Sequence, residues 1–70
     1  MKVNKYIWKT KSNEIISCDE KLKILNENLT EIENIFQSSM DDAILMGCDE
    51  NDFKSKVIEL IKNSKFSFLK

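Results

Sequence analysis

Apolar side chains recur every three or four residues through the middle of the chain, which is the spacing of one face of an α-helix. The members of this stripe are Leu22, Leu25, Leu29, Ile32 and Phe36. Their alternating intervals of three and four residues are those of a coiled-coil seam. Ile24, Ile35 and Met40 widen the stripe. The pattern predicts a helix from about Cys18 to Met46 that is buried against other helices.

Polar residues mark the ends of this long helix. Ser17 stands three residues before Glu20, which is the spacing of an N-terminal capping box. Gly47 is placed to take the left-handed conformation that ends a helix. Between these ends, Ser38 and Ser39 are a weak point, because serine side chains can bond to the backbone and interrupt a helix. A break there would give three helices, but we favour one continuous helix.

A second, shorter helix follows the glycine. Asp49 is its predicted N-cap, and acidic residues come directly after it, where the helix dipole favours negative charge. One face of this helix carries Phe53, Val57, Leu60 and Ile61. Lys62 and Lys65 suit its last turn. The sequence therefore predicts a mainly α fold, an antiparallel helical hairpin of one long and one shorter helix after a short extended N-terminal segment.

The first 16 residues have a different pattern. "MKVNKYIWKTK" alternates loosely, as a strand does, and contains Val, Ile, Tyr and Trp, which favour strands. The segment "TKSN" could turn the chain and "EIIS" could return as a second strand, with Trp8 and Ile16 anchoring the hairpin on the helices. A flexible arm that orders on a partner is the alternative. Residues 1–16 are thus an extended arm or hairpin, and 17–70 a helical hairpin domain.

The long helix carries more apolar surface than this chain can cover. The second helix is about half as long, so the half of the stripe from Leu22 to Ile32 stays open unless the N-terminal segment or a second chain covers it. A 70-residue chain has only a marginal core, and an apolar stripe of this size rarely stays in water. We therefore expect a homodimer that completes a helical bundle.

Composition narrows the setting. The chain has no proline and one glycine, which argues against an all-β fold with its many turns. No apolar run approaches the roughly 20 residues of a membrane span, and no secretory signal is evident at the N-terminus. Two cysteines without an obvious pairing favour a reducing compartment, and we expect the cytoplasm of a bacterium or a reducing compartment of a host.

Charge is segregated along the chain, although the net charge is only −1. Residues 1–11 carry four lysines and no acid, and residues 12–53 carry eleven acids and two lysines. Residues 54–70 carry five lysines and one acid. One interpretation of this charge pattern is purely structural: the basic ends fold back on the acidic middle, or each charged face is simply solvated. The sharper one is an acidic helix that docks a basic partner.

Candidate chemistry is sparse. The chain has no histidine and no arginine, and it lacks a glycine-rich phosphate loop or a nucleophile motif. "DENDF" begins like a calcium loop, but its later ligand positions do not fit. Cys18 and Cys48 lie too far apart along a continuous helix for a disulfide. We expect no catalytic residue, no metal and no cofactor, and therefore no enzyme.

The remaining function classes are binding functions. We favour a protein–protein interaction module, an adaptor, inhibitor or assembly factor of unknown pathway, whose partner is a second copy or a basic protein. The residues expected to contact a partner are Tyr6, Trp8, Glu31, Asp41, Asp42, Phe66, Phe68 and Leu69. The C-terminal "KFSFLK" could pack on the body, pair as a strand with "KYIW", or dock a partner.

A small DNA-binding or accessory transcription regulator is the alternative. Ala43, Gly47 and Phe53 have the spacing of a helix-turn-helix skeleton. The helix that would read DNA begins with Asp49, Glu50 and Asp52, whose charges would face phosphates, and the chain has no arginine for guanine contacts. Nucleic acid is therefore the less favoured partner.

If the stripe is the dimer seam, replacing Leu25 and Leu29 with alanine should weaken or dissociate the assembly. Light scattering would show the loss as a lower solution mass. A double variant with unchanged mass and unchanged stability would contradict this role of the stripe.

Overall fold

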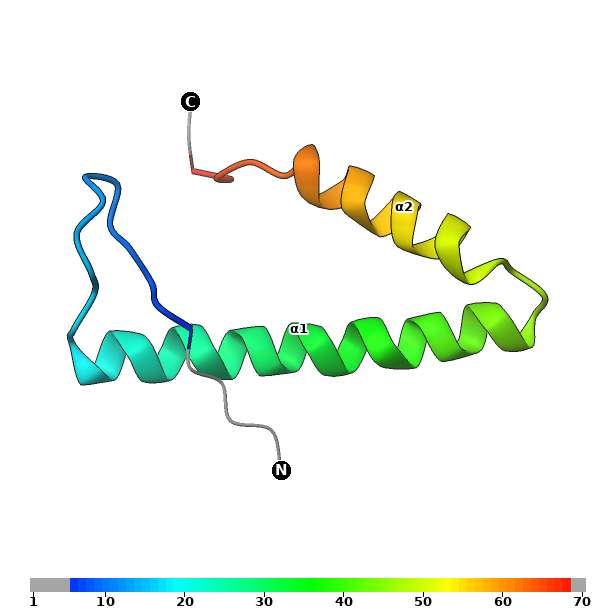
Figure 1. Cartoon of the computed structure of the whole chain (residues 1–70), viewed down its shortest axis with the longest axis horizontal. Helices are drawn as coiled ribbons and strands as arrows, with labels where there is room; N and C mark the ends of the chain where they lie inside the picture. The colour runs from blue at the N-terminus through cyan, green and yellow to red at the C-terminus, as the bar shows by residue number, and fades with distance from the viewer. Residues whose placement is uncertain (1–5, 69–70) are drawn as a thin grey trace. The chain divides into compact units, whose positions relative to one another are not determined.

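Residues 6–68 of this chain are described by a computed structural model, in which they form two helices (Figure 1). The first, α1, comprises Asp19–Leu45, and the second, α2, comprises Glu50–Lys62. The described residues contain no strand, only one isolated β-bridge. The predicted mainly α helical hairpin, with one long and one shorter helix, is confirmed. The chain divides within α1, after Ile35, into two compact units, which are described in turn.

Helix α1 runs without interruption through Ser38 and Ser39, so the alternative with three helices is wrong. A side-chain hydrogen bond supports the turn at this point, because Gln37 Nε2 donates to Asp41 Oδ1 at 3.0 Å. The helix begins one residue later than the predicted capping box requires. The amide of Leu22 donates to the carbonyl of Cys18 at 2.9 Å, which makes Cys18 the N-cap in place of Ser17.

The C-terminus of α1 is closed by its glycine. Gly47 has φ 95°, in the left-handed region, as predicted. The amide of Cys48 donates to the carbonyl of Ala43 at 2.9 Å, and the amide of Gly47 donates to that of Ile44 at 3.0 Å. These two bonds make a Schellman motif, which satisfies carbonyls that the end of a helix leaves without partners.

Helix α2 starts at the predicted cap. Asp49 has extended backbone angles, and its carboxylate accepts a hydrogen bond from the amide of Asp52 at 2.9 Å. Two ion pairs at i, i+4 follow, Lys54 with Glu50 at 2.8 Å and Lys56 with Asp52 at 2.9 Å. The hydrogen bond that Lys56 Nζ donates to the Asp52 carboxylate, together with the charge of that carboxylate, raises the pKa of Lys56 above its ordinary value.

The other end of α2 comes earlier than the charge pattern suggested. The C-cap is Asn63, whose amide donates to the carbonyl of Glu59, and the amide of Ser64 donates to the carbonyl of Ile61. Lys62 therefore lies in the last turn, as predicted, while Lys65 lies beyond the helix.

The second unit packs the end of α1 against α2. The rings of Phe36 and Phe53 lie with their centroids 5.8 Å apart. Met40, one turn after Phe36, and Val57, one turn after Phe53, are half-buried. Ala43 is 7% exposed. Ala43 is the only buried residue among those described, so the hydrophobic core of a single chain is minimal.

The first unit contains a tight turn that precedes α1. Residues 8–16 fold back on themselves, with an antiparallel bridge between Lys9 and Ile15. The amide of Ile16 donates to the carbonyl of Trp8 at 2.8 Å, and the amide of Thr10 donates to that of Glu14 at 2.7 Å. Asn13 has φ 70°, a conformation that asparagine tolerates better than most residues. The turn therefore lies at the "TKSN" segment.

Replacing Gly47 with alanine tests the helix stop. A Cβ at this position meets no atom within 4 Å, so the cost is the left-handed backbone alone, about 1 kcal/mol of unfolding free energy. Urea unfolding followed by circular dichroism measures the loss. Gly47→Asn is the matched control and should lose less, because asparagine tolerates this conformation. An alanine variant as stable as the native chain would contradict the strain.

Candidate interaction surface

Large apolar side chains are exposed along the whole described chain. Those with an exposed fraction of 42% to 86% are Tyr6, Ile7, Ile15, Ile24, Ile32, Ile35, Ile44, Leu45, Met46, Ile58, Leu60, Ile61, Phe66 and Phe68. Single exposed apolar residues are normal on proteins, but series of them along one helix face mark interaction sites. Two such series are present, one on α1 and one on α2.

The predicted self-association stripe is covered unevenly. The four members Leu22, Leu25, Leu29 and Phe36 are half-buried. Ile32, by contrast, is 60% exposed. The stripe that was predicted to be a single self-association surface is therefore not uniformly open, because the chain's own side chains partly cover most of it.

Trp8 ties the N-terminal segment to α1 in the first unit. Its indole Nε1 donates to Asn26 Oδ1 at 2.8 Å, a contact between residues 18 apart in the sequence. Asn26 lies one turn after Leu22 and one turn before Leu29, so the bond holds the indole beside the leucines of the stripe. Trp8 and Ile16 are themselves half-buried. The N-terminal segment thus takes the covering role that the sequence left open.

The opposite edge of the stripe stays open. Ile24, Ile32 and Ile35 are 57%, 60% and 66% exposed. Their spacings of eight and three residues place them on one side of α1. We call these three residues the isoleucine flank. The sequence pattern included all three in the apolar stripe, but it could not tell which of its members the chain would cover.

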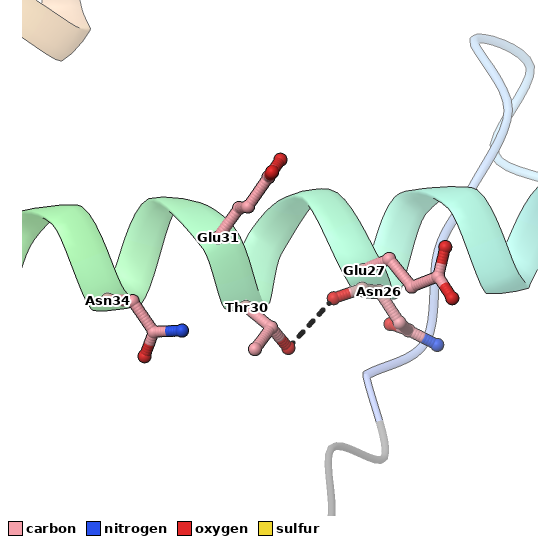
Figure 2. A pocket seen from close by; sticks show the side chains of 5 residues that line it. All are labelled: Asn26, Glu27, Thr30, Glu31 and Asn34. Atoms are coloured by element: carbon pink, nitrogen blue, oxygen red, sulfur yellow. Dashed lines mark hydrogen bonds between the residues drawn. The ribbon is translucent and has the colours of Figure 1, made fainter.

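Acidic residues border the isoleucine flank. Glu27 and Glu31, four residues apart, line a shallow hollow of about 280 Å³ together with Asn26, Thr30 and Asn34 (Figure 2). Thr30 Oγ1 donates to the carbonyl of Asn26 at 3.0 Å, and Glu31 projects away from the side that carries Thr30 and Asn34. All five side chains come from α1, so the hollow is an open surface whose carboxylates can accept from a partner's cations. Glu27 was not among the predicted contact residues.

The outer side of α2 carries the second series. Ile58 and Ile61 are 51% and 63% exposed. Ile58 points away from the side that carries Phe53, and Ile61, one turn after Val57, lies at the edge of that side. Lys62 lies beside them in a hollow of about 510 Å³ that is lined by Ser55, Ile58, Glu59, Lys62 and Asn63. Lys54, one turn before Ile58, borders the same side. We call Lys54, Ile58, Ile61 and Lys62 the lysine-edged face. It too was missed among the predicted contact residues.

The remaining predicted contact residues lie in small groups. Tyr6 contacts Trp8, with ring centroids 6.2 Å apart. Asp41 accepts the bond from Gln37, and Asp42 is exposed.

At the other end of the chain, Phe66 and Phe68 meet edge to face at 5.6 Å and are exposed. Residues 63–68 form no strand, so the predicted strand form of the C-terminal tail is absent there. Leu69, the last of the predicted contact residues, lies outside the described residues.

The described part of the chain offers little support for a disulfide, a metal site or a membrane span. Cys18 and Cys48 are free thiols. Within residues 6–68, no three His, Cys, Asp or Glu side chains gather closely enough to hold a metal ion. Neither described helix combines the length and the apolar character that crossing a membrane requires.

The chain matches no model of a known protein family, no curated protein and no solved structure. The two exposed faces are therefore the features of the chain that indicate a function.

Replacing Asn26 with alanine removes the acceptor of the Trp8 indole. The only tryptophan of the chain then loses its bond to α1 and becomes more solvated, so its fluorescence should shift to longer wavelength. Asn34→Ala is the matched control on the same helix and should leave the emission unchanged. Equal emission from native and Asn26→Ala chains would show that this bond does not hold Trp8.

Proposed function

We propose that this chain is a small, non-enzymatic protein–protein interaction module, an adaptor, inhibitor or assembly factor, which reaches its stable form as a homodimer. The observation that carries the proposal is that residues 6–68 include one buried residue, Ala43, while both helices expose series of isoleucines. A folded chain needs buried apolar surface to offset its loss of conformational entropy. Association supplies the burial that the lone chain lacks.

The local structure makes association economical. Both ends of α2 and the C-terminus of α1 are closed by their own backbone and side-chain hydrogen bonds. Three of the four helix ends are therefore already satisfied, and a partner has mainly to cover side chains. Helix faces of this kind are recognised by other helices laid along them.

The two hollows suit a polypeptide partner. Each is a shallow surface on a single helix, with Glu27 and Glu31 on α1 and Lys62 beside Glu59 on α2. Small-molecule and catalytic sites are enclosed pockets that bury most of their ligand. A shallow, charged and apolar surface instead resembles the rim and centre of a protein interface.

Charge indicates the chemistry of the partner. From residue 24 to residue 45, α1 carries five acids and no lysine. A partner with basic residues beside apolar ones complements this helix, which admits both a basic protein and a second copy. The free thiols fit a reducing compartment such as the cytoplasm.

Unfolding at different chain concentrations tests the proposal. If folding and association are coupled, a hundredfold rise in concentration stabilises the dimer by about 2.7 kcal/mol, and the urea midpoint rises accordingly. Circular dichroism at several concentrations measures this shift. A cooperative transition whose midpoint does not move with concentration would contradict coupled association.

A further inference from the structure

We infer that the isoleucine flank of α1 is the docking site for the lysine-edged face of α2 from a second copy of this chain. The inference rests on the proposed self-association and names the two surfaces that would carry it. Both surfaces expose isoleucines; Glu27 and Glu31 border the first, while Lys54 and Lys62 border the second, whose hollow Glu59 also lines. The two glutamates and the two lysines carry opposite charges, so each surface is a suitable partner for the other.

The α1 side is apolar at its centre and acidic along one edge. Ile24, Ile32 and Ile35 span 11 residues, about 17 Å of helix. Glu27 and Glu31 lie along the edge of this span, and the hollow beside them is open to a partner. No ion pair within the described residues engages either carboxylate, so both can accept bonds from another chain.

The α2 side has the complementary chemistry. Ile58 and Ile61 are exposed on α2, and the lysine-edged face from Lys54 to Lys62 covers about 12 Å of that helix, so it fits within the isoleucine flank. Lys62 has no ion-pair partner among the described residues. Lys54 is held by Glu50 at 2.8 Å, in an exposed pair that is worth little and can exchange.

A second copy satisfies both faces at once. Each chain offers one acidic and one basic face, so a two-fold dimer forms the same contact twice and leaves neither series of isoleucines in water. Since opposite charges at an interface set partner choice, the pairing also excludes α1 against α1 in the same register, where carboxylates would meet.

Charge reversal tests this pairing. Glu31→Lys places two lysine-bearing faces against each other, and Lys62→Glu does the same with two acidic faces. Because each reversal acts twice in the dimer, either variant alone should associate about tenfold more weakly than the native chain. An equimolar mixture of the two variants restores both contacts and should associate as the native chain does. Sedimentation or light scattering measures all three.

Two matched controls separate this pairing from general charge effects. Glu14→Lys and Lys11→Glu make the same changes of charge at exposed positions of the N-terminal turn, and both should associate as the native chain does.

A second pair of variants tests the apolar part of the contact. Ile32 and Ile58 are 60% and 51% exposed in the single chain, so their replacement by serine should weaken association with little effect on local helix content. If the native chain associates but the reversals and serine variants do not change it, this contact is wrong while the proposed function stands. A mixture of reversals that stays dissociated also overturns the contact. A native chain that remains a folded monomer overturns both proposals.

Discussion

Burial of apolar surface is the constraint on which this protein depends. Two helices of 27 and 13 residues can cover one another along only part of the longer helix. In the second unit, Phe36 and Phe53 make that cover, with Ala43 buried beside them in α1. In the first unit, the hydrogen bond from Trp8 to Asn26 holds the N-terminal segment to α1. Neither contact reaches the isoleucine flank, so its side chains remain exposed and available to a second copy.

The helix boundaries could be predicted because local chemistry decides them. Gly47 ends α1 since few other residues take a left-handed conformation without cost, and Asp49 starts α2 because its carboxylate reaches an amide three residues on. The N-cap of α1 is predicted at Ser17 but lies at Cys18, because the spacing of a capping box does not locate a helix start to within one residue. The continuity of α1 through its serines followed from the unbroken apolar period.

The surface could be predicted only in part, because it depends on contacts between distant residues. Periodicity places Ile32 and Leu29 in one stripe, yet one is exposed and the other half-buried. Trp8 is bonded to Asn26, 18 residues further along the chain, and no local pattern encodes this contact. Glu27 and Ile58 were overlooked for a similar reason. Their interest comes from lying beside exposed isoleucines, and exposure is a property of the folded chain.

Self-association is the central claim, and the solution mass tests it most directly. Light scattering across a concentration series should give twice the 8.2 kDa of one chain, with dissociation on dilution. A folded chain that keeps the mass of a monomer at every concentration would contradict the claim, because the isoleucines of α1 and α2 would then be stable in water without a second copy.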